Sequence, residues 1–332
     1  MFENLIEVLK NDPRKIVYTE GSDARILESA ARLKKDGFLT PILVGNVDEV
    51  KAAAAKGGFD IEGLEILDPA TYEGMDAMVD EMVALRKGKM SAEDCRAALS
   101  KGNYFGTMLV KMGVADCLLG GATYSTADTV RPALQLVKTK KGAHLVSSCF
   151  IMIRGDETLA MGDCAINIDY QDTVDKECNV TFTAAQKLAE VAVATAETAK
   201  VFGIDPKVAM LSYSTKGSGK GPNVDLVRNA TEEAKKLAPE LKLDGEMQFD
   251  AAVSPVVGQL KFPGSPVAGY ANTFIFPEIQ SGNIGYKIAA RLGGFAAYGP
   301  ILQGLNAPIN DLSRGCNAEE VYQMSIITAA LK

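Results

Sequence analysis

Apolar and polar positions along the first 140 residues alternate between two spacings. Short runs of β-branched and aliphatic residues are typical of buried strands. Between these runs, apolar residues recur every three or four positions, as in 22–37 and 47–58, and a glycine ends both segments. This spacing predicts helices, with Ser22 as the N-cap of the earlier one. The expected strands are 15–21, 40–46, 64–69 and 116–121, and the expected helices are 22–37, 47–58, 71–100 and 125–139.

The alternation of strand-like and helix-like segments continues through the rest of the chain. Residues 144–155 and 158–167 have the composition of two adjoining strands joined by a short turn, and an antiparallel pair is one arrangement that this turn allows. A glycine-rich loop, 212–225, interrupts the later alternation. The remaining expected strands are 207–215 and 268–278, and the remaining expected helices are 181–203, 224–239, 281–294 and 317–332.

Strands that alternate with helices favour a mainly parallel sheet covered by helices, so we predict an α/β fold. A length of 332 residues suggests two domains, each with its own core. The boundary is expected near 140–150, and the last helix is expected to return to the first domain. We therefore predict one α/β domain over 1–143 plus 305–332, and a second over 144–304.

Composition and charge narrow the class of protein. Hydrophobic residues make up 47% and charged residues 23%, as in ordinary globular proteins. No apolar run reaches the length of about eighteen residues that a membrane span needs, and the N-terminal segment has no apolar signal core. The net charge of −7 argues against a nucleic-acid partner. We expect a cytoplasmic protein without a membrane or nucleic-acid partner.

The six cysteines are spread over more than two hundred residues without a CxxC pair, and His144 is the single histidine. This pattern predicts neither a zinc site nor a disulfide framework, and we expect no metal. Small buried apolar side chains are the favoured interpretation of the cysteines.

The glycine-rich loop "SYSTKGSGKGPNVD" (212–225) resembles a place to hold phosphate. A Walker A loop requires GxxxxGK followed by serine or threonine. Here Gly221 follows Lys220, and Ser214 stands where the leading glycine should be, so the match fails at both ends. Two interpretations remain open: a flexible turn between strand and helix, or a backbone nest with lysines around a phosphorylated ligand.

The stretch "GGATYSTADTVRPALQ" (120–135) combines glycines, hydroxyls and an arginine at an expected helix start. Free N–H groups there attract anions, and Arg131 can grip phosphate through two hydrogen bonds. Pro132 is expected in the first turn of this helix. Ordinary capping by the hydroxyls is the alternative, and we favour the anion site. The hydroxyl residues concerned are Ser125, Thr126 and Thr129.

The stretch "APINDLSRGCNAEE" (307–320) places Asp311, Ser313 and Arg314 close together before a helix that begins with two glutamates. A carboxylate, a hydroxyl and an arginine could deprotonate a nucleophile and stabilise an anion. A capped helix start explains the same residues equally well.

Four long blocks, in this order, carry a resemblance that covers essentially the whole chain. They are "YTEGSDARIL", "GTMLVKMGVADCLLGGATYSTADTVRPALQ", "LSYSTKGSGKGPNVD" and "FPEIQSGNIGYKIAARLGGFAAYGPILQGLNAPINDLSRGC". With these blocks the chain resembles the phosphate acetyltransferases, or phosphotransacetylases. The related phosphate butyryltransferases share part of the pattern, and "STADTVRPALQ" and "NDLSRGC" favour the acetyl enzymes.

The resemblance implies interconversion of acetyl-CoA plus phosphate with acetyl phosphate plus CoA, with CoA as a substrate and no cofactor. It implies two α/β domains around an interdomain cleft that holds the active site, and a homodimer. It places Arg131 on the phosphate side, Ser313 and Arg314 beside the CoA thiol, and Arg86 in the cleft. Glu320 then occupies the position of the general base, where aspartate is usual, and Tyr124 stands where histidine is expected.

The same resemblance makes other polar residues candidates for substrate binding. The glycine-rich loop is expected to face acetyl phosphate or inorganic phosphate, with its lysines adding positive potential. Asp311 is the alternative base. The substrate-binding candidates are Ser125, Thr126, Thr129, Arg86, Ser214, Thr215, Gly217, Lys220, Asn310 and Asp311, and Lys216 is expected to add positive potential only.

We expect direct attack of the CoA thiolate on the acetyl carbon within a ternary complex, because holding two substrates together supplies much of the rate. A ping-pong path through Cys164 or Cys316 is the alternative, and we favour structural roles for both. Rival classes are a nucleotide phosphotransferase, which needs the missing P-loop, and a decarboxylating dehydrogenase, which lacks a clear GxGxxG. A non-catalytic acyl-CoA-binding module is the non-enzymatic alternative.

Overall fold

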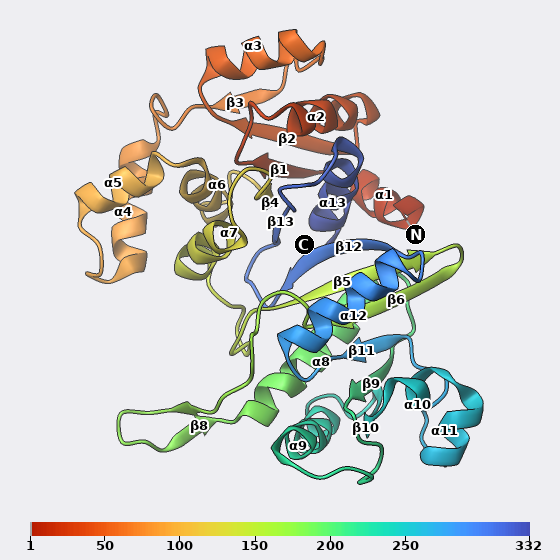
Figure 1. Cartoon of the computed structure of the whole chain (residues 1–332). Coiled ribbons are helices and arrows are strands. Elements are labelled where there is room, and N and C mark those ends of the chain that lie inside the picture. Colours follow the sequence, from red (N-terminus) through yellow and green to blue (C-terminus); the bar gives the residue numbers. More distant parts are fainter. Residues whose placement is uncertain (1) are drawn as a thin grey trace. The chain divides into compact units, whose positions relative to one another are not determined.

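The computed structural model describes residues 2–332, and the chain divides into two compact units. The first unit comprises Met1–Lys141 together with Leu305–Lys332, and the second comprises Gly142–Gly304. Each unit is an α/β structure with its own sheet (Figure 1). Strand pairing is mostly parallel, which confirms the predicted fold class.

The first unit is built on a parallel sheet with the order β13-β4-β1-β2-β3. The chain runs outward from β1 to β2 and β3, and then crosses to the other side of β1 for β4 and β13. The order therefore reverses between β1 and β4, and the carboxyl ends of these strands lie at one edge. The strands are β1 (Arg14–Tyr18), β2 (Leu39–Val44), β3 (Glu65–Leu67), β4 (Cys117–Gly120) and β13 (Ile309–Asp311).

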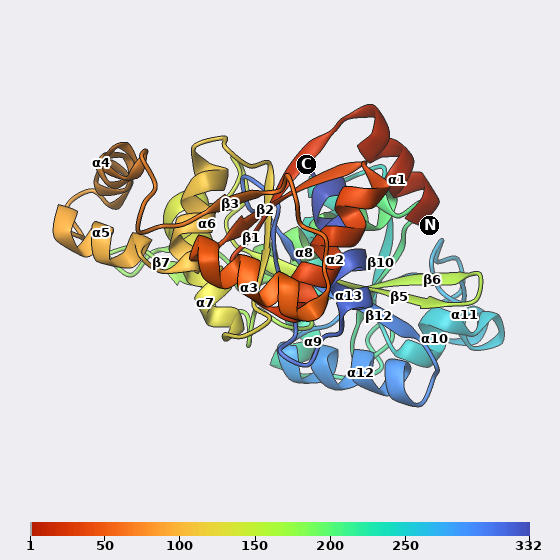
Figure 2. The same cartoon turned by 90° about the horizontal axis from the view of Figure 1, so that it is seen from above.

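Helices cover this sheet, and the C-terminal helix α13 (Ala318–Ala330) packs against α1 (Phe2–Asn11) and α2 (Ala24–Asp36), as both views show (Figure 1, Figure 2). The last helix thus returns to the first unit. The other helices are α3 (Val47–Gly57), α4 (Met75–Arg86), α5 (Ala92–Leu99), α6 (Gly102–Lys111) and α7 (Thr126–Pro132), which continues as the π-helical turn η1 (Ala133–Val137).

Local signals explain where most of these helices begin and end. Gly37 and Gly58 adopt left-handed backbone angles after α2 and α3, as the glycine pattern predicts. The N-cap of α2 is Asp23 and not Ser22, because the Asp23 carboxylate accepts a hydrogen bond from the Arg25 amide.

Pro132 ends α7 instead of opening it, so the prediction that it lies in the first turn is wrong. Proline has no N–H to donate to the preceding turn, and the wider π-helical turn follows directly after it. Arg131 consequently lies in the last turn of α7, away from its start, with an exposed side chain.

The second unit contains a six-stranded sheet with the order β10-β9-β11-β6-β5-β12. The pairs from β10 to β6 are parallel, whereas β5 pairs with β6 and β12 in antiparallel fashion. The expected strand pair over 144–167 is therefore an antiparallel hairpin. The strands are β5 (Ser147–Arg154), β6 (Glu157–Gly162), β9 (Lys207–Leu211), β10 (Lys242–Met247), β11 (Thr273–Ile275) and β12 (Ala296–Gln303).

A small separate hairpin extends away from this sheet (Figure 1). It consists of β7 (Thr173–Val174) and β8 (Val180–Phe182) and lies just before α8. The helices of the second unit are α8 (Ala184–Val201), α9 (Pro222–Leu237), α10 (Phe249–Val253), α11 (Pro255–Lys261) and α12 (Ile279–Arg291). Among the described residues, no helix is both long and apolar enough to cross a membrane.

Candidate active site

The candidate site lies in the first unit, at the carboxyl edge of the sheet where the strand order reverses. Open α/β sheets bind ligands at such a position. Glu20 lies after β1. Gly120 ends β4, and Gly121 and Tyr124 follow it. Asp311 is the last residue of β13. Residues that lie roughly one hundred and three hundred positions apart in the sequence therefore meet there.

Glu20 holds the loop that follows β4. Its carboxylate accepts hydrogen bonds from the Gly121 amide at 3.3 Å, the Thr123 amide at 2.9 Å and the Thr123 hydroxyl at 3.2 Å. The Thr19 hydroxyl also donates to it, at 2.8 Å. Burial raises the pKa of Glu20 by more than these hydrogen bonds lower it.

Asp311 is a second buried carboxylate, with 2% of its surface exposed. Its two oxygens accept hydrogen bonds of 2.6 Å from the hydroxyls of Thr126 and Thr129. Burial raises the pKa of Asp311 and the nearby Glu20 raises it further, whereas the two hydroxyls and Arg314 lower it; the net direction is upward. The predicted residues Thr126, Thr129 and Asp311 are thus brought together.

Two adjacent glycines make this close approach possible. A Cβ at Gly120 would lie 2.3 Å from both the Thr19 and the Tyr124 hydroxyl oxygens. A Cβ at Gly121 would lie 2.2 Å from Asp311 Oδ1, and its φ of +98° also favours glycine.

Tyr124 lies inside the cluster, where the resemblance leads one to expect histidine. Its hydroxyl is 2.7 Å from that of Thr19. Burial and the neighbouring Glu20 carboxylate raise the pKa of Tyr124, so the phenol stays protonated. Tyr124 therefore serves as a neutral hydrogen-bonding group.

Arg25 ties together three segments around the site. Its guanidinium donates to the carbonyl oxygens of Ala122 at 2.8 Å, Arg314 at 2.9 Å and Cys316 at 3.1 Å. It also forms an ion pair with Asp23 at 2.8 Å. Sequence reasoning missed Glu20 and Arg25, although both belong to the block "YTEGSDARIL" that helped to carry the resemblance.

Ser313 and Arg314 form an exposed turn between β13 and α13. The Ser313 hydroxyl accepts a hydrogen bond from the Gly315 amide at 3.2 Å. Glu320 closes a capping box: its carboxylate accepts from the Asn317 amide at 3.0 Å, and the Asn317 side chain accepts from the Glu320 amide at 2.9 Å. The capped start of α13 that the sequence allowed is therefore present. The exposed carboxylate of Glu320 is part of this cap.

The other predicted site residues of the first unit are Asn310, Ser125 and Arg86, and each has surroundings of its own. Asn310 is fully buried and donates to the Thr328 hydroxyl of α13 at 2.9 Å, and its role in substrate binding stays a prediction. The Ser125 hydroxyl donates to Asp128 at 2.7 Å. Arg86 ends α4, and its buried Nε has no hydrogen-bond partner among the described residues.

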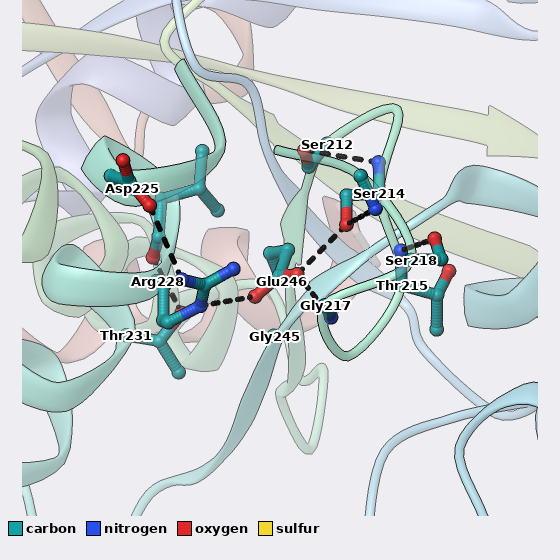
Figure 3. A network of polar contacts seen from close by, with 12 residues as sticks. Ser212, Ser214, Thr215, Gly217, Ser218, Asp225, Arg228, Thr231, Gly245 and Glu246 are labelled. Atoms are coloured by element: carbon teal, nitrogen blue, oxygen red, sulfur yellow. Dashed lines mark hydrogen bonds and ion pairs between the residues drawn. The ribbon is translucent and has the colours of Figure 1, made fainter. Parts of the chain in front are cut away.

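The glycine-rich loop of the second unit is organised around a buried carboxylate, Glu246 of β10 (Figure 3). Glu246 accepts hydrogen bonds from the Ser214 hydroxyl at 2.9 Å and the Gly217 amide at 2.8 Å. Arg228 Nε lies 3.3 Å from its other oxygen. Burial alone would raise the pKa of Glu246, but these hydrogen bonds outweigh burial and lower it.

This arrangement argues against an open phosphate nest in the loop. The donors of Ser214 and Gly217 are directed at an internal carboxylate, and the Thr215 hydroxyl is 3.2 Å from Gln248 Oε1. Of the loop residues proposed to contact phosphate, Gly217 and Lys220 are exposed, and Lys216 is exposed as well. The loop forms a hydrogen-bonded turn between β9 and α9.

A pocket of about 550 Å³ opens beside Glu20. Thr19, Glu20 and Thr123 line one part of it, and residues around the ends of β1, β2 and β3 and near the start of α6 line the rest. The described residues contain no group of three or more His, Cys, Asp or Glu that could hold a metal ion. Burial raises the pKa values of the Cys164 and Cys316 thiols, which disfavours either as a thiolate nucleophile.

Comparison with known proteins shows which sequences and structures this chain is similar to. A family model for phosphate acetyl/butaryl transferases matches residues 1–329. The chain is 52% identical to the phosphate acetyltransferase of Bacillus subtilis, over 99% of this chain and 98% of that protein. A phosphotransacetylase structure from Streptococcus pyogenes has a TM-score of 0.93 and 54% identity, covering 99% of this chain and 97% of that one. The EutD phosphotransacetylase from Staphylococcus aureus has a TM-score of 0.88 and 48% identity, covering 99% and 98%.

The fold and these matches define an acyltransferase, which confirms the predicted enzyme class. More particularly, the chain belongs to the phosphate acetyl/butyryl transferase family, and the predicted phosphate acetyltransferase function is confirmed.

Proposed function

We propose that acetyl transfer occurs at the carboxyl edge of the sheet in the first unit, by direct attack of the CoA thiolate on acetyl phosphate in a ternary complex. The reverse reaction joins acetyl-CoA and phosphate. The observation that carries this proposal is the Ser313–Arg314 turn. It begins two residues after the buried Asp311, and Arg25 hydrogen-bonds both this turn and the loop after β4.

The proposed mechanism needs a base for the CoA thiol. A thiol with a pKa of about 8.5 is only a few per cent thiolate at neutral pH. We assign proton acceptance to Glu320, since its carboxylate is exposed in the first turn of α13, and a hydrogen bond to the sulfur to Ser313. Asp311 is the alternative base, supported by its burial and raised pKa.

Negative charge develops on the carbonyl oxygen and on the departing phosphate. We propose that Arg314, Arg131 and the amides at the start of α7 stabilise it, an effect of about 3 kcal/mol per donor. Arg86, Thr126 and Thr129 are proposed to complete the anion-binding surface, together with Ser125. For the glycine-rich loop, we propose no direct contact with phosphate. Its proposed contribution is the positive electrostatic potential of Lys216 and Lys220.

No cofactor or covalent enzyme intermediate is required in this proposal. The raised pKa values of Cys164 and Cys316 support direct transfer over an acyl-cysteine path. A cytoplasmic location is also proposed, supported by the six free cysteines, which suit a reducing compartment.

The decisive assay measures CoA-dependent release of phosphate from acetyl phosphate without nucleotide. We expect release that requires CoA and yields acetyl-CoA in equal amount. Release without CoA, or a requirement for nucleotide, would contradict the proposal. The family description also names butyryl transfer, so a longer acyl chain is the second candidate. The same assay with butyryl phosphate distinguishes the two, and we expect a higher kcat/KM for the acetyl substrate.

A homodimer is proposed as the assembly. Support comes from an apolar stripe at the solvent-exposed side of α12 in the second unit. Ile284, Ile288 and Leu292 follow one another at four-residue spacing and are 58%, 53% and 85% exposed. Neighbouring apolar residues at this spacing share one helix face and are typical of a contact surface.

A further inference from the structure

Glu20 and Arg25 hold the loop that joins β4 to α7, which we call the β4–α7 loop (residues 121–125). The Glu20 carboxylate accepts hydrogen bonds from the amides of Gly121 at 3.3 Å and Thr123 at 2.9 Å. Arg25 donates to the carbonyl oxygen of the residue between these two, at 2.8 Å. Two side chains that follow β1 therefore fix both N–H and C=O groups of the loop.

The number of donors around Glu20 explains why a carboxylate stands at this position. Besides the two amides, the Thr123 hydroxyl donates to it at 3.2 Å and the Thr19 hydroxyl at 2.8 Å. Four hydrogens thus converge on two oxygens, and a carboxylate accepts all of them without a hydrogen of its own. A glutamine here has one acceptor oxygen, and its NH2 group faces donors. Because a negative charge repels phosphate, the site gains from Glu20 its acceptors and not its charge.

Hydrogen bonds, more than packing, hold this part of the loop. Thr19, Glu20 and Thr123 line the pocket of about 550 Å³, and Thr123 is exposed. Side chains beside an open pocket have few apolar contacts that could replace a lost hydrogen bond. Removal of the Glu20 acceptors therefore frees the β4–α7 loop to move.

The loop leads directly into residues that are proposed to bind phosphate. Thr126 begins α7, and its hydroxyl donates to Asp311 at 2.6 Å. Thr129, one turn further along, donates to the other oxygen of Asp311 at 2.6 Å. Ser125 is the N-cap of α7 but makes no capping hydrogen bond with its side chain. The start of α7 is therefore located by the loop that precedes it and by these two hydroxyl contacts.

We propose that Glu20 is a positioning residue for phosphate: it holds the β4–α7 loop, and through it the Thr126 and Thr129 hydroxyls, in the geometry that binds the anion. Glu20 itself does not contact substrate. This inference rests on the proposed function, which places phosphate at these hydroxyls. Glu20 holds one loop, whereas Arg25 also reaches the turn that contains Arg314. Loss of the Glu20 acceptors therefore weakens phosphate binding and leaves acetyl-CoA binding unchanged.

The test measures the KM values for phosphate and for acetyl-CoA separately in Glu20→Gln and Glu20→Ala. We expect the KM for phosphate to rise about tenfold in Glu20→Gln, the order of one lost hydrogen bond to a charged group. It should rise further in Glu20→Ala, which has no acceptor, and the KM for acetyl-CoA should not change in either variant. A merely structural role lowers the fraction of folded enzyme, and with it kcat, but moves neither KM. An unchanged KM for phosphate, or an equal rise in both KM values, would overturn the positioning role.

Asp116→Asn is the matched control. Asp116 also accepts a backbone amide, that of Lys15 at 2.7 Å, but it precedes β4 and so lies at the opposite edge of the sheet from Glu20. Both KM values should stay at the wild-type level in this variant. If its KM for phosphate rises as much as that of Glu20→Gln, the effect does not come from the β4–α7 loop and the inference is wrong.

Thr129→Val separates this inference from the proposed function, because it removes a hydroxyl that is proposed to bind phosphate directly. A raised KM for phosphate in both Thr129→Val and Glu20→Gln supports the inference. If it rises only in Thr129→Val, the phosphate site stands and the role of Glu20 is wrong. If it rises only in Glu20→Gln, this hydroxyl is not what Glu20 positions. If it rises in neither, the proposed location of phosphate is wrong and the inference fails with it.

Discussion

At the scale of single residues, the site depends on how closely polar side chains can approach one another. Gly120 and Gly121 leave no room for side chains of their own, and the oxygens of Thr19, Tyr124 and Asp311 occupy the space. The pair "GG" is visible in the sequence, but its partners are not. Thr126 and Thr129 lie 185 and 182 positions from Asp311, so only the fold can reveal that their hydroxyls meet this carboxylate.

The base assignment predicts a specific defect for Glu320→Gln. Turnover should fall by roughly two orders of magnitude or more, with little change in KM, because general-base catalysis typically contributes about that much. Steady-state kinetics with acetyl phosphate and CoA measure both constants. Near-normal turnover would transfer the role to Asp311.

Glu320 also caps α13, so the control must separate capping from proton acceptance. Asn317→Ala removes the partner in the capping box but leaves the Glu320 carboxylate. It should lower the free energy of unfolding by about 1 kcal/mol and preserve most of the turnover. If both variants lose turnover equally, the effect of Glu320→Gln comes from the cap.

Arg25→Lys provides a second prediction at this scale. Lysine keeps the charge but cannot reproduce the planar fork that reaches the carbonyl oxygens of Ala122, Arg314 and Cys316. We expect turnover to fall at least about tenfold, since small displacements of catalytic groups have large effects. Arg32→Lys on the same helix is the control, because Arg32 is half-exposed and pairs with the exposed Glu319. Equal activity of the two variants would contradict the positioning role of Arg25.

At the scale of helices and strands, local signals predict much of the fold. The glycines after α2 and α3 and the alternation of apolar runs place these elements correctly. Strand β10 was missed because its sequence, "KLDGEM", contains two acids and a glycine. Glu246 is nevertheless buried there, because a loop about thirty residues earlier in the chain supplies its hydrogen bonds.

The glycine-rich loop yields a prediction about stability and pH. Because the folded-state pKa of Glu246 is lowered, its ionised form contributes stability above the unfolded pKa of about 4.3, and this contribution is lost as pH falls through the folded value. Glu246→Gln should therefore lower the free energy of unfolding at pH 7, and its difference from the wild type should shrink in acid.

Denaturant unfolding at several pH values checks this expectation. Glu232→Gln on α9 is the control, since Glu232 is exposed and pairs only with the half-exposed Lys235. It should change the free energy of unfolding by less than about 1 kcal/mol at every pH. A difference for Glu246→Gln that does not vary with pH would show that its charge is unimportant.

At the scale of the whole molecule, each unit has a buried core, but some apolar surface stays exposed. Ile284, Ile288 and Leu292 form an apolar stripe that is exposed to solvent. Apolar side chains on a helix of a single folded unit would normally face its core. Sequence periodicity predicts that α12 has an apolar face, and it cannot tell whether that face packs inside the unit or against another copy. In the structure, Gly282 is the only buried residue of α12. The apolar stripe therefore lies on the surface of the unit.

The proposed homodimer predicts that Ile288→Lys yields a monomer. In a two-fold contact, the same patch faces itself, so one substitution places two lysines in the interface, and burying these charges without partners is unfavourable. Sedimentation velocity should show a dimer for the wild type and a monomer for Ile288→Lys, with nearly unchanged thermal stability of each unit. Leu237→Lys is the matched control, because Leu237 is a 55% exposed leucine at the end of α9, outside the stripe. A dimeric Ile288→Lys variant, or a Leu237→Lys variant that dissociates in the same way, would remove the stripe on α12 as the surface through which two copies associate.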